Sequence, residues 1–279
     1  SRVQNHINWI TQRPEYLASI SKRAQPFLYL VVSEVEKEEV PIEIALLPIV
    51  ESDYYPFSYS HGTATGIWQF IPSTGRMYGL DEDWWHEDRR DVLASTKAAV
   101  RYLKDLNRMF DGDWLLSIAA YNAGPGRVQR AIDKNRNQGK RTDYWSLDLP
   151  KETEKYVPKL LALGKVLKNP ERFNQKLIKI ENKPYLEPIN LESQFDLALI
   201  AQWTNLSIDE IYSFNPGLKR WATPEELPYT ILLPVDVVDD FKEILTNQKN
   251  RPKVSWTRYK VKKGDSLSVI AQSFNTNIG

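Results

Sequence analysis

The sequence predicts an α+β fold, in which a mainly helical part is followed by a smaller part that contains strands. In residues 1–170, apolar residues recur at spacings of three and four, the period of amphipathic helices. Short runs rich in β-branched and aromatic residues appear after this point. The 279 residues suffice for about two domains with a sizeable core.

Several helices of the first part have recognisable ends. Residues 41–50 are apolar on nearly every face, which predicts a buried helix whose last turn is distorted by Pro48. Residues 92–110 carry one apolar stripe behind Asp91, a good N-cap. A further helix at 113–121 ends before a glycine and a proline. The remaining expected elements of this part are a helix at 152–167 and loops at 62–66 and 72–75.

The second part alternates short strands with helical patches. Strands are expected at 178–180, 185–189 and 229–233. Residues 197–205 recur imperfectly at 267–275, seventy residues later, with matching Leu, Ile, Ala, Gln and Asn. Two copies of one small module would explain the recurrence, and chance similarity between two helices is the alternative.

The composition excludes several classes of function. Lys+Arg 37 against Asp+Glu 36 leaves a net charge of +1, so neither nucleic acid nor an anionic membrane surface is expected as a partner. The absence of cysteine excludes disulfides, thiolate zinc sites and a cysteine nucleophile. The 3 histidines lack metal-ligand spacing, so we expect no metal and no cofactor. No apolar run approaches the roughly 20 residues of a membrane-spanning helix.

Glu51 is the most informative single residue. It follows the apolar run 41–50, and burial without a cationic partner raises the pKa of a carboxyl group. A carboxyl of this kind stays protonated near neutral pH and can donate a proton. A glutamate satisfied at a helix end is the structural alternative. The polar, glycine-punctuated segment 58–72 and the 9 Trp and 14 Tyr, whose rings suit stacking on sugars, favour the functional interpretation.

Four separated motifs occur in order along the first part: Glu51-Ser52, Gly66-Ile67-Trp68-Gln69-Phe70-Ile71-Pro72, Ala120-Tyr121-Asn122-Ala123-Gly124, and Glu152-Thr153 with Tyr156-Val157. Together they resemble the lysozyme-like catalytic domain of the lytic transglycosylases, over residues 30–170. Residues 259–261 with 264–267 resemble the opening of a lysin motif (LysM), a βααβ module that binds peptidoglycan.

The resemblance predicts the domain organisation. We expect a lysozyme-like catalytic domain with an N-terminal helix at 1–175 and a divergent LysM-like module at 176–250. We also expect the start of a truncated LysM module at 256–279. Whether the region after the catalytic domain binds glycan, packs on the catalytic part or regulates it is left open by the sequence, although Trp203, Trp221 and Trp256 favour packing.

The resemblance implies an enzyme that acts on peptidoglycan glycan strands. It would cleave the β-1,4 bond between N-acetylmuramic acid and N-acetylglucosamine without water, giving a 1,6-anhydromuramoyl end. Glu51 would protonate the leaving oxygen and then, as a base, take the proton of the C6 hydroxyl that attacks C1. The substrate's own 2-acetamido group would stabilise the cationic centre.

The resemblance also implies substrate-binding residues. These are Ser60, Gln69, Tyr121, Asn122 and Tyr156, and Tyr121 is expected to hydrogen-bond Glu51 or the acetamido group. For each, an ordinary structural role is the alternative.

Three nearby residues are expected to stay outside the chemistry. Trp68 is expected to pack in the core, and Asp53, two residues after Glu51, to point away from the site. Ile71 replaces the methionine that many family members carry, which affects a sugar-contact surface rather than the reaction.

Two other functions remain in competition. A lysozyme-type muramidase, which is a hydrolase, is disfavoured because the sequence offers no evident second catalytic carboxylate. A non-catalytic LysM wall-binding protein is disfavoured by the Glu51 motifs. The family is attached to the outer membrane through a lipidated cysteine, so we expect a periplasmic protein whose anchor is absent from this chain. Protein partners are left open.

Overall fold

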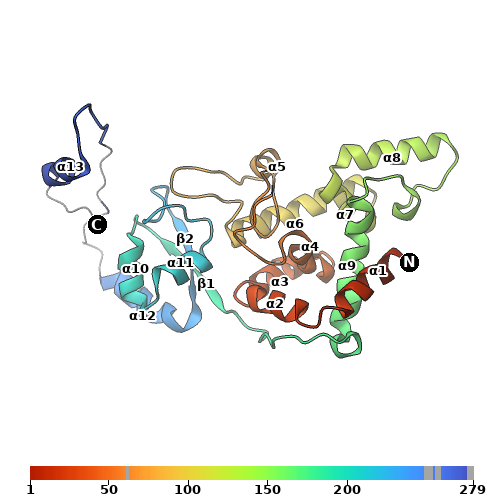
Figure 1. Cartoon of the computed structure of the whole chain (residues 1–279), viewed down its shortest axis with the longest axis horizontal. Helices are drawn as coiled ribbons and strands as arrows, with labels where there is room; N and C mark the ends of the chain where they lie inside the picture. The colour runs from red at the N-terminus through yellow and green to blue at the C-terminus, as the bar shows by residue number, and fades with distance from the viewer. Residues whose placement is uncertain (61–62, 248–253, 255–258, 275–279) are drawn as a thin grey trace.

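The computed structural model describes residues 1–60, 63–247, 254 and 259–274. It has the predicted α+β architecture, with a helical part next to a smaller part that contains both strands (Figure 1). The helical part comprises α1 (Arg2–Thr11), α2 (Tyr16–Ala24), α3 (Leu28–Lys37), the 3-10 helix η1 (Ile42–Leu46), α4 (Leu47–Ser52), α5 (Pro72–Met77), α6 (Val92–Met109), α7 (Trp114–Ala123), α8 (Pro125–Asn137), η2 (Tyr144–Ser146), α9 (Thr153–Lys168) and η3 (Pro170–Phe173).

The helix ends read from the sequence are confirmed at α6, α7 and α9. Asp91 accepts a hydrogen bond from the amide of Ala94 (2.7 Å) at the start of α6, and Asp113 caps α7 in the same way. Side-chain caps of this kind satisfy amides that the first helical turn leaves unpaired. Helix α7 ends at Gly124, whose φ of +84° lies in the region that favours glycine.

Two local predictions in the helical part are wrong, and proline explains both. Residues 41–50 form η1 followed by α4 rather than one helix, and Pro48 lies in the first turn of α4 instead of distorting the last. Residues 72–75 belong to α5, which Pro72 begins, rather than to a loop. Proline has no amide hydrogen and a fixed φ, so it suits the first helical turn, where amides have no intrahelical partner.

The second part has the predicted order of strand, two helices and strand. It contains β1 (Leu186–Leu191), α10 (Leu197–Thr204), α11 (Ile208–Phe214) and β2 (Tyr229–Pro234), followed by α12 (Val235–Asn247). The strands pair antiparallel, with Leu186 opposite Pro234 and Leu191 opposite Tyr229. The expected strand at 178–180 is not formed, because this polar-flanked segment has no neighbouring strand to pair with in the described structure.

The repeated sequence forms a helix in both places. Helix α10 follows the cap Asp196, and α13 (Leu267–Ser273) follows the cap Ser266, whose hydroxyl accepts a hydrogen bond from the amide of Val269. Residue 275, which ends the second copy, and residues 276–279 lie outside the described residues. The described residues contain no helix long and apolar enough to cross a membrane.

The second part packs on the first through a segment that precedes α6. Residue His86 forms an antiparallel bridge with Leu218, and the amide of Lys219 donates to the carbonyl of Trp85 (2.8 Å). The rings of Trp85 and Trp221 meet edge to face, with centroids 5.4 Å apart. Trp221 therefore lies at the contact between the two parts, in agreement with packing of the second part on the first.

The other two tryptophans named in the sequence do not add to this contact. Trp203 packs inside the second part, against Phe195 and Phe241. Trp256 lies outside the described residues.

Candidate active site

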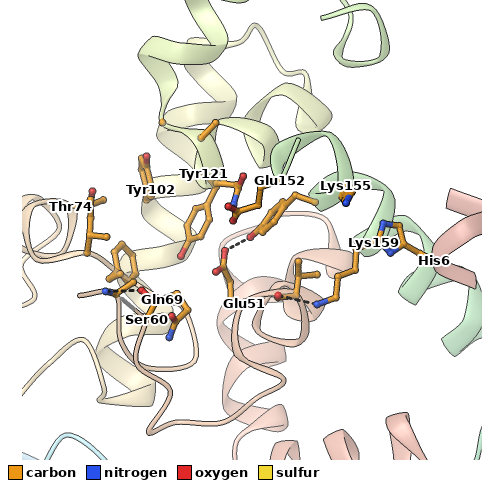
Figure 2. Close-up of a pocket in the computed structure, with 18 residues that line it drawn as sticks. His6, Glu51, Ser60, Gln69, Thr74, Tyr102, Tyr121, Glu152, Lys155 and Lys159 are labelled. Carbon is orange, nitrogen blue, oxygen red and sulfur yellow. Dashed lines mark hydrogen bonds between the residues drawn. The ribbon is translucent and has the colours of Figure 1, made fainter. Parts of the chain in front are cut away.

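The cleft of the helical part contains every residue that the sequence suggested for the site. It has a volume of about 710 Å³, and its lining includes Glu51, Ser60, Gln69, Tyr121, Asn122 and Tyr156. Figure 2 shows Glu51 in the middle of the cleft, with Tyr121, Glu152 and Lys159 around it. Segments far apart in the sequence thus contribute to one site: α4, the loop that follows it, α7 and α9.

Glu51 lies in the last turn of α4, half-buried at the wall of the cleft. The hydroxyl of Tyr156, from α9, donates a hydrogen bond to its Oε1. Burial raises the pKa of Glu51 to about 7, against the opposing effects of the Tyr156 hydrogen bond and the charge of Lys159. The charge of Glu152 adds to the rise. A carboxyl in this state exists in both protonation forms near neutral pH, as an acid that later serves as a base requires.

Tyr121 does not make the expected hydrogen bond with Glu51. Its hydroxyl donates to the carbonyl of Trp68 (2.8 Å), which ties α7 to the loop after α4. Its ring lies 5.3 Å from that of Tyr102 and 6.2 Å from that of Phe70, measured between centroids. Tyr156 rather than Tyr121 is therefore the tyrosine that touches the glutamate.

Asn122 connects two helices at the rim of the cleft. Its amide Nδ2 donates to Oε1 of Glu152 (3.0 Å), and its Oδ1 accepts a hydrogen bond from the hydroxyl of Thr153 (2.8 Å). Both side-chain groups of Asn122 are thus engaged with the start of α9. Asn122 orients Glu152 towards the cleft, and this fits the motif in which Glu152 and Thr153 are adjacent.

Gln69 and Ser60 lie on the loop side of the cleft. Gln69 adopts a left-handed φ of +49°, and its Nε2 donates to the carbonyl oxygens of Gly66 (2.8 Å) and Ser58 (3.3 Å). The side-chain oxygen of Gln69 makes no hydrogen bond with the described residues, which leaves an acceptor for a ligand. The hydroxyl of Ser60 accepts a hydrogen bond from the amide of Ala64 (3.3 Å) and retains its own hydrogen for donation.

The loop is fixed from behind by buried groups. The guanidinium of Arg89 pairs with Glu87 and donates to the carbonyl oxygens of Thr63 (2.9 Å) and Phe70 (3.2 Å). The hydroxyl of Ser52 lies within hydrogen-bond distance of the carbonyl of Ile67 (3.0 Å). These contacts hold the loop at three backbone carbonyls, and Ser60 and Gln69 of this loop line the cleft together with Glu51.

Asp53 and Trp68 behave as the sequence indicated. The carboxylate of Asp53 accepts a hydrogen bond from the hydroxyl of Tyr16 on α2 (2.8 Å) and does not line the cleft. Trp68 is fully buried, and its Nε1 donates to the hydroxyl of Thr96 (2.8 Å). Ile71 does line the cleft, and its side chain is exposed.

The sequence reasoning did not assign the basic residues His6, Lys155 and Lys159 to the cleft, and it named Glu152 only as part of a motif, without a role in the site. Residues 152, 155, 156 and 159 have the spacing of one helix face. Because the motif already placed Tyr156 in the site, this spacing could have predicted that the other three lie near it. His6, from the separate helix α1, gave no signal. The described residues contain no group of side chains that could hold a metal ion.

The presence of Glu152 corrects one expectation. The sequence offered no evident second carboxylate, yet Glu152 lines the same cleft as Glu51 and acts on its pKa. The hydrolytic alternative therefore has a candidate second carboxylate, which an experiment has to address.

Three family descriptions match successive parts of the chain. They are "Transglycosylase SLT domain" over residues 31–144, "Lytic transglycosylase MltD, LysM-like domain" over 185–250 and "LysM domain" over 259–279.

The sequence is similar to curated proteins. Membrane-bound lytic murein transglycosylase D of Escherichia coli (strain K12) is 40% identical over 281 residues, covering 97% of this chain and 62% of the relative. A putative tributyltin chloride resistance protein of Alteromonas sp. (strain M-1) is 35% identical over 188 residues, covering 67% of this chain and 89% of the relative. The chain thus spans about three fifths of the length of the first relative.

Among solved structures, the lytic transglycosylase Slt of Pseudomonas aeruginosa matches with a TM-score of 0.41 and 24% identity, over 52% of this chain and 24% of that one. The succession of the three matched domains and the 40% identity along nearly the whole chain agree with the motifs gathered in the cleft. The chain belongs to the family of the membrane-bound lytic murein transglycosylases D.

Proposed function

We propose that the chain is a peptidoglycan lytic transglycosylase, which cleaves the β-1,4 bond between N-acetylmuramic acid and N-acetylglucosamine without water. The observation that carries the proposal is the carboxyl of Glu51, half-buried at the centre of the cleft with a pKa raised to about 7. Family membership supports the substrate class.

In the first step Glu51 acts as a general acid. Its proton passes to the glycosidic oxygen, the bond from that oxygen to C1 of the muramoyl sugar breaks, and a carboxylate remains. The hydroxyl of Tyr156 stabilises this carboxylate by donating a hydrogen bond to it. Burial and the charge of Glu51 raise the pKa of Tyr156 well above its usual value, so the phenol keeps the proton that it donates.

In the second step the carboxylate of Glu51 acts as a base. It takes the proton of the C6 hydroxyl while the C6 oxygen bonds to C1 of the same sugar, which closes the 1,6-anhydro ring. The nucleophile and the electrophile belong to one sugar of the substrate, so they are already close to each other. The attack therefore needs no water positioned by the enzyme, as a hydrolase does. We assign stabilisation of the positive charge at C1 to the substrate's 2-acetamido group.

The remaining residues would hold the sugars in place. The free oxygen of Gln69 and the hydroxyl of Ser60 would bind substrate from the loop side. Tyr121 would shape the wall through its ring, and Asn122 would act indirectly, by orienting Glu152.

A hydrolase is the second candidate, because Glu152 supplies a carboxylate in the same cleft. A muramidase of the lysozyme type uses such a group as a nucleophile or to activate water. In the transglycosylase, Glu152 instead sustains the raised pKa of Glu51 by its charge. The variant Glu152→Gln separates the two: the hydrolase loses its reaction, whereas the transglycosylase still releases anhydro products.

The test is mass spectrometry of the muropeptides that the purified chain releases from sacculi. The proposal predicts products one water lighter than the corresponding reducing sugars, and none with Glu51→Gln. Reducing ends would identify a hydrolase. Release by Glu51→Gln at the wild-type rate would exclude Glu51 as the acid, and no release by the wild type would favour a wall-binding protein.

We propose a periplasmic location at the outer membrane, where the substrate lies. The E. coli relative is named as membrane-bound. The β1–β2 part, which matches the LysM-like description, would contribute to holding the glycan strand.

A further inference from the structure

The two ends of the cleft differ in charge. Figure 2 shows Thr74, Ser60, Gln69 and Tyr102 on one side of Glu51, and Lys155, Lys159 and His6 on the other. The first end offers hydroxyl groups, an amide and an aromatic ring, which suit neutral sugars. The second offers two ammonium groups and an imidazole.

The cationic end is assembled from two helices. Lys155 and Lys159 are four residues apart on α9 and lie on the same face of that helix. His6 comes from α1, which packs along α9, and the backbone and the charge of Lys155 both act on the pKa of its imidazole. Burial and the charges of both lysines lower the pKa of His6, which shows that the three groups act on one another.

The charged groups of this end make no salt bridge with the described residues, although the charges of Asp53 and Glu51 act on Lys159 from a greater distance. In the described part of the chain, no carboxylate lies within salt-bridge distance of Lys155, Lys159 or His6. The ammonium of Lys159 donates to the carbonyl of Val50 (3.1 Å), and Lys155 is exposed.

The acids nearby are already engaged. Glu154 pairs with Arg2 (3.5 Å), and Asp53 accepts its hydrogen bond from Tyr16. Glu152 accepts from Asn122. Two like charges beside a cleft, with no carboxylate in salt-bridge distance, favour an anionic ligand group there.

We propose that Lys155, Lys159 and His6 form a subsite that binds a carboxylate of the peptidoglycan strand while Glu51 acts on the neighbouring glycosidic bond. The inference rests on the proposed function and names the part of the substrate that the cationic end of the cleft binds. The hydroxyl and acetamido groups of the sugars are neutral, so a carboxylate of the strand has two sources. One is the peptide attached to the lactyl group of N-acetylmuramic acid, and the other is the lactyl carboxylate itself, which is free where the peptide has been removed.

The experiment measures KM for two purified strands with the full chain, one carrying peptides and one stripped of them. The variant is Lys155→Gln, which removes one exposed charge of the subsite. The control is Lys165→Gln, because it removes the same charge from an exposed position of α9 outside the cleft. We expect Lys155→Gln to raise KM about fivefold at low salt on the strand that supplies the carboxylate, with the smaller change in kcat. Lys165→Gln should leave KM unchanged.

The outcomes distinguish the two sources of the carboxylate and test the subsite separately from the proposed function. A rise in KM confined to the peptide-bearing strand supports a peptide carboxylate, and a rise confined to the stripped strand supports the lactyl carboxylate. The same rise with Lys165→Gln, or no rise on either strand while anhydro products are still formed, overturns the subsite and leaves the proposed function intact. If the wild type forms no anhydro products on either strand, the proposed function fails and the subsite with it.

Discussion

At the scale of single residues, the pKa of Glu51 is set by neighbours that act in opposite directions. Burial and the charge of Glu152 raise it, whereas the hydrogen bond of Tyr156 and the charge of Lys159 lower it. The resulting value of about 7 suits a group that must first give a proton and then take one. The upper limit of the pH range of activity is therefore the pH at which Glu51 loses its proton.

The neighbours of Glu51 predict two opposite shifts of this limit. Lys159→Met removes a positive charge that favours the carboxylate, so the pKa of Glu51 rises and the alkaline limb of kcat/KM moves to higher pH. Glu152→Gln removes a negative charge that disfavours the carboxylate, so the limb moves to lower pH. Each shift is expected to be on the order of half a pH unit, and pH profiles of turnover measure both.

Lys165→Met is the matched control, since Lys165 is an exposed lysine of the same helix that does not line the cleft. Its pH profile should equal that of the wild type. Shifts of the same sign in Lys159→Met and Glu152→Gln would contradict the assignment of the limb to Glu51.

At the scale of elements, the loop between α4 and α5 depends on one close backbone contact. Gly66 has a φ of +79°, and a Cβ atom at this position would lie 2.1 Å from the carbonyl oxygen of Arg89. The side chain of Arg89 holds the same loop at Thr63 and Phe70. Glycine at position 66 therefore permits the approach that fixes the cleft wall.

Gly66→Ala is expected to destabilise the protein by about 2 kcal/mol or more, because both the backbone conformation and the contact must change. Turnover should fall with it, since Gln69 belongs to the displaced loop. Gly139→Ala is the control: Gly139 also has a positive φ, of +65°, but a Cβ atom there meets nothing within 4 Å. Chemical denaturation compares the two, and equal losses would show that the contact with Arg89 is unimportant.

The sequence predicts elements well where side chains cap their ends and poorly where proline has two roles. Asp91 and Asp113 marked the starts of α6 and α7 because their carboxylates bond the first amides. The sequence predicts a distorted last helical turn at Pro48 and a loop at 72–75, although Pro48 and Pro72 each lie in the first turn of a helix. Whether a proline disturbs one helix or begins the next depends on how the residues around it pack in space. A local sequence pattern does not contain that information.

At the scale of the whole molecule, the second part packs against the first through a common apolar core. Leu186, Phe214 and Leu232 of the second part belong to the same buried apolar cluster as the helices of the first. Lys219 also joins the two parts, by donating to Glu82 (2.7 Å). This contact lies next to Arg89, whose side chain holds the wall of the cleft.

A truncation that ends near residue 176 tests the coupling of the two parts. It retains Gln175, whose buried amide donates to the carbonyl oxygens of Ile10 (2.7 Å) and Arg13 (3.0 Å) and so closes the helical part. It exposes the apolar side chains that the second part covers, so we expect the Tm to fall by at least several degrees and turnover to fall with it. Calorimetry and product release measure the two effects, and unchanged values of both would refute a supporting role.

The site was largely predictable because its motifs also position its residues. Glu51, Ser60, Gln69, Tyr121, Asn122 and Tyr156 all reach the cleft. The partners of their side chains were less predictable: Tyr121 bonds Trp68 instead of Glu51, and Lys159 and His6 enter through packing of α9 against α4 and α1. Such contacts arise from tertiary structure, which the spacing of residues within one segment does not encode.

The central claim is that the glycosidic bond is broken without water, by Glu51 and the C6 hydroxyl of the substrate. The most direct test is digestion of sacculi by the wild-type chain in water labelled with the heavy isotope of oxygen, followed by mass spectrometry of the new chain ends. The account predicts that the new muramoyl ends carry no label, because the C6 oxygen of the sugar forms the new bond. One heavy oxygen in each new end would contradict it and would identify hydrolysis, with Glu152 as the candidate second carboxylate.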